Sequence, residues 1–183
     1  MTSTSQSYPR LAFCSAITPA DPAHYLNLRK AGIDTASICL HASGFEYYKF
    51  ATIHTQLARK ADLATHAFMI TDLLDPFADV TTFFKRFNQL GYDSNAKITV
   101  WVNGDKYVAN RETKIMEIID LIAKCHNREN IDLAFFKRDI DDKLYDLSKM
   151  PQMINLTIIN CEGTFFFNDT ATTEIYTMDF CNE

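Results

Sequence analysis

Apolar runs of strand length alternate with helix-forming segments along most of this chain, and the connections between them are short. The runs are 11–17, 35–40, 63–70, 98–102, 131–136 and 153–159. Parallel strands need a crossover connection, which a helix supplies. The alternation therefore predicts an α/β fold with a parallel sheet, and the runs that are apolar nearly throughout indicate strands covered on both faces.

Residues between these runs predict where the helices begin and end. Asp75 and Pro76 form a start signal, a capping side chain followed by proline at the first helical position, and Gly91 ends that helix. The spacing predicts a buried face made of Phe77, Val80, Phe84 and Phe87. For the helix that begins near residue 50, the predicted face is Phe50, Ile53, Leu57 and Ala61. His24 and His54 are expected to face solvent or an interface.

A barrel and an open, doubly wound sheet both satisfy this order of elements. The first apolar run is not followed by G-x-G-x-x-G, and G-x-x-x-x-G-K-[ST] is missing, which removes the usual nucleotide-binding reasons for an open sheet. The order of elements alone leaves both architectures open.

Composition excludes several classes of partner. The formal net charge is -5 and the pI is near 5.5, so the chain lacks the electrostatic footprint of a nucleic-acid or membrane-surface binder. The five cysteines are scattered without a C-x-x-C pair, and the sequence has no H-E-x-x-H. We expect no cofactor and no metal, and a cytoplasmic location without a signal peptide of its own.

Five segments carry a resemblance to one family. They are 28–44 (LRKAGIDTASICLHASG), 50–70 (FATIHTQLARKADLATHAFMI), 75–91 (DPFADVTTFFKRFNQLG), 97–105 (KITVWVNGD) and 153–160 (MINLTIIN). In order and spacing they resemble the glycoside hydrolase family 25 domain, the muramidase-type lysozymes of phages and bacteria. The resemblance implies an irregular eight-stranded β/α barrel, here truncated at its carboxyl end. We therefore expect a TIM-like (β/α) barrel, incomplete, with about six strands and a non-native tail. The predicted organisation is a disordered arm at 1–9, a barrel domain at 10–164 and a tail at 165–183.

The chain departs from that family at its catalytic acids. The resemblance implies an acid on the first strand, where residues 12–15 read AFCS, and an Asp-x-Glu on the fourth, where residues 101–103 read WVN. A family Glu falls at Ser43 and a family His near Met69. No catalytic residue is carried over, and the domain is expected to be catalytically degenerate. Asp105 is the one candidate for a relocated carboxylate.

Other polar groups near strand ends are candidates for binding a ligand. The candidate ligand-binding residues are Trp101, Asn103, His41, Ser15 and Ser43. An indole face can stack on a sugar ring, and filling of the barrel core explains a tryptophan here equally well. His66 lies inside an apolar run and is expected to line the core. The remaining acids near strand ends are Glu46, Asp72, Asp75 and Glu162.

Three functions follow from this pattern. The first is a muramidase-like domain that binds bacterial cell-wall glycan or a protein partner without cutting. The second is an active peptidoglycan glycosidase that uses relocated carboxylates, with Asp105 foremost. The third is a structural domain of a phage or prophage particle, so the chain can also be phage-associated or released at lysis. The sequence does not fix an oligomeric state.

The segment from Phe165 to Thr177 resembles a translated sequencing adapter. Residues 168–177 read NDTATTEIYT, which matches a common library adapter codon by codon, and the three preceding phenylalanines resemble a translated poly-T run. A natural Thr-rich strand is the alternative, because Thr, Ile and Tyr favour strands. Our hypothesis is that the reading frame is an assembly artefact from about Phe165.

Re-sequencing of the source DNA tests this hypothesis. We expect the genomic sequence to diverge from the printed one shortly after Gly163. Recovery of the same codons within uninterrupted genomic sequence would contradict it.

Overall fold

The computed structural model describes residues 11–45, 48–151, 154–160, 164–169 and 172–177. The described strands form one eight-stranded sheet in chain order. They are β1 (Leu11–Cys14), β2 (Thr35–Ala42), β3 (Ala64–Thr71), β4 (Ile98–Val102), β5 (Ile131–Phe136), β6 (Asn155–Asn160), β7 (Thr164–Asp169) and β8 (Thr172–Thr177). The α-helices are α1 (Pro22–Lys30), α2 (Phe50–Lys60), α3 (Pro76–Gln89), α4 (Arg111–Ala123) and α5 (Lys137–Asp141).

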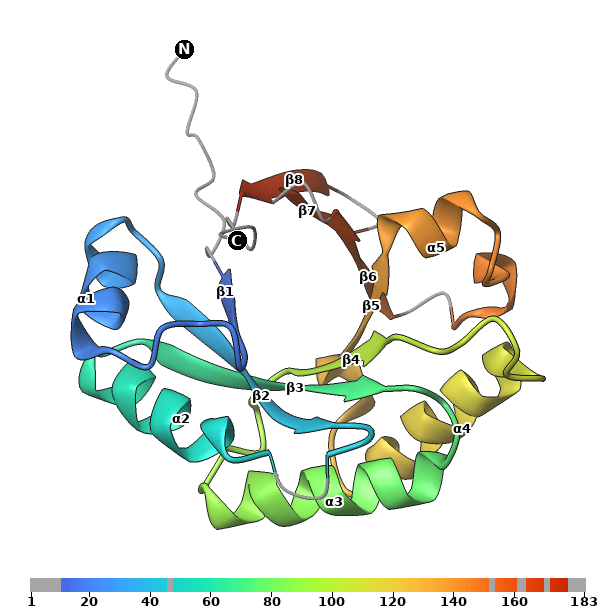
Figure 1. Ribbon diagram of the computed structural model, residues 1–183, viewed down its shortest axis with the longest axis horizontal. Coiled ribbons are helices and arrows are strands. Elements are labelled where there is room, and N and C mark those ends of the chain that lie inside the picture. Colours follow the sequence, from blue (N-terminus) through green and yellow to red (C-terminus); the bar gives the residue numbers. More distant parts are fainter. Residues whose placement is uncertain (1–10, 46–47, 152–153, 161–163, 170–171, 178–183) are drawn as a thin grey trace.

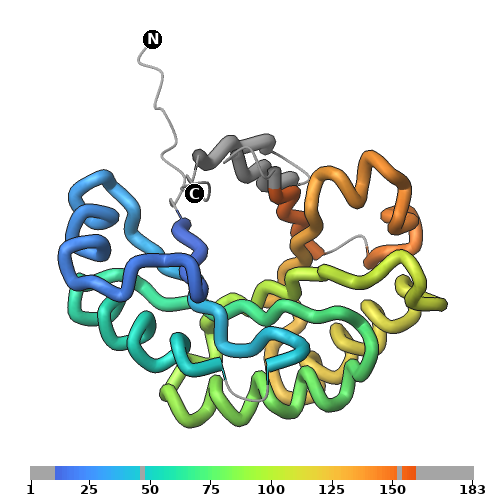
Figure 2. Tube along the Cα trace, viewed as in Figure 1, coloured from blue at the N-terminus to red at the C-terminus, as the bar shows by residue number. Residues whose placement is uncertain are grey.

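Strands β1 to β6 are parallel, whereas β7 and β8 continue the sheet as antiparallel strands. The sheet curls, so that β1 and β6 lie on opposite sides of its concave face, and α1 to α4 lie on its convex side (Figures 1 and 2). The prediction of an incomplete TIM-like barrel is thus confirmed.

Aromatic contacts across the concave face show how strongly the sheet curves. The Phe13 ring on β1 lies 5.3 Å from Phe68 on β3 and 6.1 Å from Trp101 on β4, and Trp101 lies 5.3 Å from Phe136 on β5. In a flat sheet, strands three positions apart are separated by about 14 Å, since neighbours are about 4.8 Å apart. Phe13 and Trp101 therefore meet because the sheet is rolled, and a flat nucleotide-type sheet is excluded.

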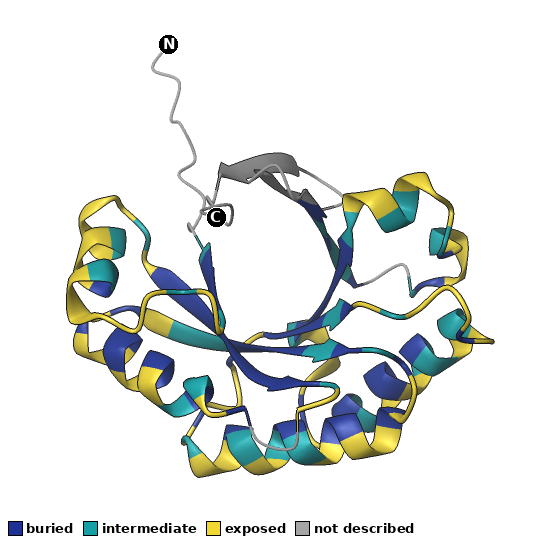
Figure 3. Cartoon of the chain, viewed as in Figure 1, coloured by how far each residue is buried: buried dark blue, intermediate teal, exposed yellow. Residues whose placement is uncertain are grey.

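The convex face of the sheet packs against the helices as an apolar core. Alternate residues of β4 (Ile98, Val100 and Val102) are fully buried on the side opposite Trp101, and α4 buries an isoleucine face. Figure 3 shows buried strands beneath helices whose outer sides are exposed. The two sides of the sheet are thus covered differently, by helices outside and by aromatic rings inside.

The predicted start of α3 is confirmed, but its predicted buried face is rotated. Asp75 caps the helix by accepting a hydrogen bond from the backbone N–H of Ala78 at 3.0 Å. The helix buries Val80, Phe83 and Phe87, and Phe77 is 66% exposed. The prediction for Phe77 was wrong, because Phe83 shares a helical face with Val80 and Phe87 and fills the core in its place.

Two expectations for α2 were also wrong. His54 is fully buried, and its Nδ1 lies 2.6 Å from the hydroxyl of Tyr25 on α1. Burial lowers the pKa of His54, so a neutral ring fits this place. Ile53, expected on the buried face, is instead exposed.

None of the helices in the described ranges combines the length and apolar character needed to span a bilayer.

Two buried thiols, Cys14 and Cys39, lie inside the strands, and burial raises the pKa of each to about 12. Both behave as small apolar residues. The proposed limits of the arm, the domain and the tail remain predictions.

Two phenylalanines on α3 offer a matched test of the buried face. Phe83→Ala is expected to lower the free energy of unfolding by about 3–5 kcal/mol, since it empties a fully buried site. Phe77→Ala is expected to change it by less than about 0.5 kcal/mol. Urea denaturation of both variants measures this, and equal losses would contradict the placement of α3.

Candidate functional site

The carboxyl ends of β1 to β5 lie at one edge of the sheet because these strands run parallel. In a β/α barrel this end, which we call the mouth, is where ligands bind. The residues that follow the strands, and those at the last positions of each strand, therefore form the candidate site. Ser15, Ser43, Asn103 and Trp101 all lie at or just beyond a strand end.

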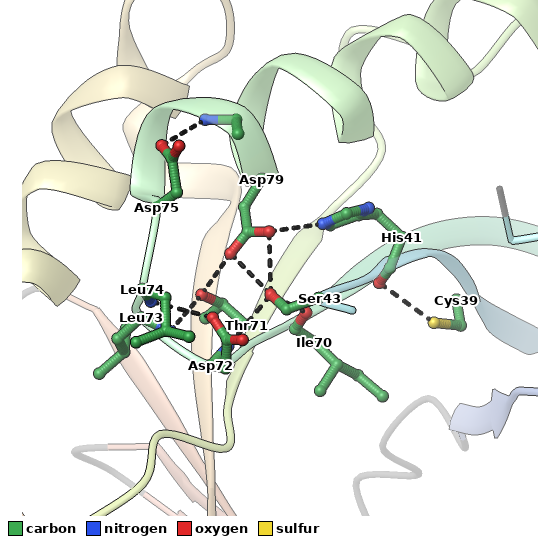
Figure 4. A network of polar contacts seen from close by, with 11 residues as sticks. Cys39, His41, Ser43, Ile70, Thr71, Asp72, Leu73, Leu74, Asp75 and Asp79 are labelled. Atoms are coloured by element: carbon green, nitrogen blue, oxygen red, sulfur yellow. Dashed lines mark hydrogen bonds and ion pairs between the residues drawn. The ribbon is translucent and has the colours of Figure 1, made fainter. Parts of the chain in front are cut away.

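A buried carboxylate connects three elements beside the mouth. Asp79, in the first turns of α3, accepts hydrogen bonds from His41 Nε2 at 2.7 Å, from Ser43 Oγ at 2.8 Å and from Thr71 Oγ1 at 2.7 Å (Figure 4). His41 is near the end of β2, and Thr71 ends β3. Asp79 thus fixes α3 to the ends of two neighbouring strands.

The surrounding donors keep Asp79 ionised. Burial by itself raises the pKa of this carboxyl group, but the hydrogen bonds from His41, Thr71 and Ser43 outweigh burial, and the pKa is lowered. Since the carboxylate can only accept, His41 Nε2 carries the proton of their shared bond. The position of Asp79 near the positive end of the α3 dipole favours the negative charge as well.

This Ser, His and Asp set is not arranged for nucleophilic catalysis. In a catalytic triad the serine hydroxyl bonds to the imidazole, which removes its proton. Here Ser43 Oγ and His41 Nε2 both bond to Asp79, and Ser43 Oγ also accepts the backbone N–H of Asp72 at 3.1 Å. The set therefore holds loops in place. His41 and Ser43 are brought together, but on the side of the sheet that faces α3.

Trp101 lies on the concave face, near the mouth. It is half-buried and is surrounded by the rings of Phe13, Phe68 and Phe136. Its indole Nε1 is buried and has no hydrogen-bond partner among the described residues. A buried N–H without an acceptor is costly. Because this nitrogen is shielded from solvent, only other atoms of the half-buried ring are open to a ligand.

The other predicted site residues lie in the loops of the mouth. Asn103 is exposed, and its backbone N–H donates to the carbonyl of Thr71 at 2.8 Å. Ser15 is half-buried in a turn closed by Thr18, whose Oγ1 accepts the Ser15 N–H at 2.9 Å. Asp105 is exposed and accepts the N–H of Tyr107 at 2.9 Å. Their proposed contacts with a ligand remain predictions.

The loop that carries Asn103 and Asp105 is held by side chains from two directions. The Tyr145 hydroxyl accepts the N–H of Gly104 at 3.1 Å, and Arg111 donates to the carbonyls of Lys106 and Leu144, each at 2.9 Å. Gly104 has little space, since a Cβ there would lie 2.9 Å from the side chain of Leu73. These contacts hold the loop in one defined conformation.

The remaining strand-end acids have local partners or lie outside the described residues. Asp72 accepts the backbone N–H of Leu74 at 2.9 Å, and Asp75 caps α3. Glu46 and Glu162 fall outside the described ranges. Within those ranges, no three His, Cys, Asp or Glu side chains are grouped so as to hold a metal ion. His66 lies on β3, where its Nδ1 accepts the N–H of Lys97 at 3.1 Å.

Asp79, Thr71 and Tyr145 were not foreseen as part of this region. Asp79 lies 38 positions after its partner His41, and no local pattern joins two residues so far apart. The sequence feature that could have pointed to Asp79 is its position in the first turns of a predicted helix. The helix dipole alone also explains an acid at such a position.

The Asp79 network makes a prediction for stability. Asp79→Ala leaves the buried donors of His41 and Thr71 without this acceptor, together with the half-buried hydroxyl of Ser43, and is expected to cost about 3–5 kcal/mol. Because its pKa is lowered in the folded state, Asp79 stabilises fully above its ordinary value of 3.8, and this contribution disappears as pH falls through the lowered pKa. Denaturation at pH 7 and pH 3 measures both effects.

Asp75→Ala, which removes an exposed helix cap, is the control and is expected to cost about 1 kcal/mol. Equal losses of stability for Asp79→Ala and Asp75→Ala would contradict the network.

Comparison with known proteins places the fold. No protein-family model and no curated protein matches the chain, whereas solved structures do. A glycosyl hydrolase 25 virulence factor of Streptococcus pneumoniae matches with a TM-score of 0.63 and 12% identity, over 82% of this chain and 67% of that one. The catalytic domain of the endolysin ply40 from bacteriophage P40 of Listeria monocytogenes matches with a TM-score of 0.60 and 12% identity, over 77% and 71%.

A muramidase from Trichobolus zukalii matches with a TM-score of 0.54 and 10% identity, over 70% of this chain and 66% of that one. The chain thus spans about two thirds of the length of these structures. At 10 to 12% identity the likeness is one of fold. The chain has a lysozyme-like barrel fold of the glycoside hydrolase 25 type.

Proposed function

We propose that this chain is a muramidase-like barrel domain that binds bacterial cell-wall glycan at its mouth without hydrolysing it. The observation that carries this proposal is the end of β4. The chain has Trp101, Val102 and Asn103 there, where the family resemblance implies Asp-x-Glu. The described residues form the barrel and an aromatic surface, and the end of β4 carries no pair of acids.

Glycoside cleavage needs a proton donor and a second carboxylate or an assisting substrate group. Asp72, Asp75 and Asp105 are the acids of the described residues that directly follow β3 and β4. Each accepts a backbone N–H two or three residues further along the chain. All three carboxylates thus have a local role in shaping a turn or capping a helix, which supports a domain that binds rather than cuts.

The aromatic cluster gives the binding half of the proposal its chemistry. Sugar rings have apolar faces that pack on aromatic rings, while polar groups fix their hydroxyls. Trp101 and Phe136 are half-buried next to the exposed Asn103, whose side-chain amide can both donate and accept.

A sedimentation assay with purified peptidoglycan tests binding and cleavage together. We expect the chain to sediment with the walls and to leave their turbidity unchanged. Trp101→Ala is expected to weaken sedimentation at least about tenfold, or 1.4 kcal/mol. Trp101→Phe, which keeps a ring in the cluster, controls for loss of packing, and its affinity should fall between the two. Failure of the wild type to sediment would contradict binding.

An active glycosidase with relocated carboxylates is the second candidate. It is favoured by one observation, the exposed carboxylate of Asp105 on a loop held by Arg111 and Tyr145. Falling turbidity with the wild type, abolished by Asp105→Asn, would establish this candidate and refute the non-catalytic proposal. A structural role in a phage particle remains a prediction, which neighbouring genes test.

A further inference from the structure

Helix α1 is attached to the rest of the fold mainly through one side chain. Of its nine residues only Tyr25 is buried, and that side chain is fully enclosed. Leu28 adds a half-buried contact with the core, and the other residues of α1 are exposed or half-buried (Figure 3). The helix lies at the end of the helical layer, beside α2 (Figure 1). Because buried side chains fix a helix on a sheet, the position of α1 depends on Tyr25.

The hydroxyl of Tyr25 is held by groups outside α1. His54 Nδ1, on α2, lies 2.6 Å from this hydroxyl, which also interacts with the thiol of Cys14 at the end of β1. Burial raises the pKa of Tyr25, so the hydroxyl keeps its proton and can donate it to Nδ1. A protonated imidazole carries hydrogens on both nitrogens and cannot accept this bond. The bond that holds α1 therefore requires a neutral His54.

A second histidine packs on the same tyrosine. The ring of His24 lies 5.4 Å from the ring of Tyr25, and the ring of His54 lies 6.0 Å from it. The Nε2 atoms of both histidines are buried and have no hydrogen-bond partner among the described residues. Burial lowers the pKa of each histidine, and the proximity of His24 lowers the pKa of His54 further. Both rings are thus placed where a positive charge is unfavourable.

The groups that face the two histidines offer little compensation for a charge. They are Asp21 and Tyr25 from α1, Cys14 and the Ser15 backbone from β1 and its loop, Lys49, Phe50, Thr55 and Arg59 from α2 and its cap, and Tyr92 from the loop after α3. Asp21 favours a charged His24 and the Ser15 backbone favours a charged His54, but burial outweighs each. In the described chain, the histidine that forms an ion pair with an acid is His41.

We propose that α1 is a pH-sensitive element: protonation of His54, together with His24, breaks the bond to Tyr25 and releases α1 from α2 and β1 while the sheet stays folded. Each of α2, α3 and α4 buries several side chains, so these helices continue to cover the sheet when α1 leaves. The Cys14 thiol, which interacts with Tyr25 in the closed form, then becomes accessible.

The direction of the pH dependence follows from the neutral histidines of the closed form. Their pKa values are lowered there, so the open form binds more protons in acid. The closed form is therefore favoured fully above pH 6.5, the ordinary pKa of histidine, and it loses this advantage as pH falls through the lowered values. Each histidine changes the opening equilibrium by at most about tenfold per pH unit.

Labelling of thiols in the full chain with 4,4′-dithiodipyridine tests the proposal. Mass spectrometry after digestion gives the rate at each cysteine at pH 7 and pH 5, and the exposed Cys125 serves as the reference for reagent reactivity. Relative to Cys125, Cys14 is expected to react about tenfold faster at pH 5 than at pH 7. Cys39, buried within β2, should stay protected at both.

Three variants identify the titrating group. His54→Asn can keep an acceptor near Tyr25 but cannot gain a proton, so it should remove most of the rise at Cys14. His66→Asn changes a histidine on β3 whose pKa is also lowered by burial, and as the matched control it should keep the rise. Tyr25→Phe removes only the hydroxyl and should raise the labelling of Cys14 at pH 7 about fivefold, as expected for one lost hydrogen bond. This last variant decides the matter if His54→Asn does not fold.

Three results would overturn the proposal. Equal rises at Cys14 and Cys39 would mean that the whole chain unfolds in acid. An undiminished rise in folded His54→Asn would mean that another group titrates. Unchanged labelling of Cys14 at pH 7 in Tyr25→Phe would mean that the hydroxyl does not hold α1.

Discussion

The contact between Phe13 and Trp101 is the interaction on which the rest of the structure depends. It joins β1 to β4 across the concave side of the sheet, at a ring distance of 6.1 Å that a flat sheet does not permit. With Phe68 and Phe136 it forms an aromatic layer that holds the sheet in its rolled form. The curvature then gathers the carboxyl ends of the strands around one mouth.

A second constraint positions the loops of that mouth. Asp79 is held by His41, Ser43 and Thr71, so the first turns of α3 are fastened to the ends of β2 and β3. A charged group buried in this way is stabilising only when all of its partners are present. Ser43 and His41, which suggest chemistry in the sequence, instead hold α3 against the strand ends through Asp79.

Much of the fold was predictable, since periodicity and caps are local signals. The predicted strands at 98–102 and 131–136 coincide with β4 and β5, and the Asp75 cap begins α3 as expected. Periodicity was weaker on which face of a helix is buried. In α3 apolar residues lie on more than one side, so the spacing favours Phe77 as well as Phe83, and only packing against the sheet decides between them.

The location of the candidate site was predictable, but its hydrogen-bond partners were not. The carboxyl ends of parallel strands lie at one edge of a sheet, so the sequence pattern alone predicts that Ser15, Asn103 and Trp101 lie at the mouth. Which polar groups pair with each other depends on contacts between residues far apart in the chain, as in His41 and Asp79. Local sequence patterns do not identify such pairs. His41 was expected to bind a ligand, whereas its Nε2 donates to Asp79 in the structure.

A crystal structure of the chain with a bound N-acetylglucosamine hexamer tests the central claim most directly, that the barrel keeps a glycan surface without a pair of catalytic acids. The account predicts sugar density along the mouth, in contact with Trp101 and with the loops after β3 and β4, and an unbroken glycan. A sugar held between two carboxyl groups about 5–9 Å apart, the separations of retaining and inverting glycosidases, would contradict it.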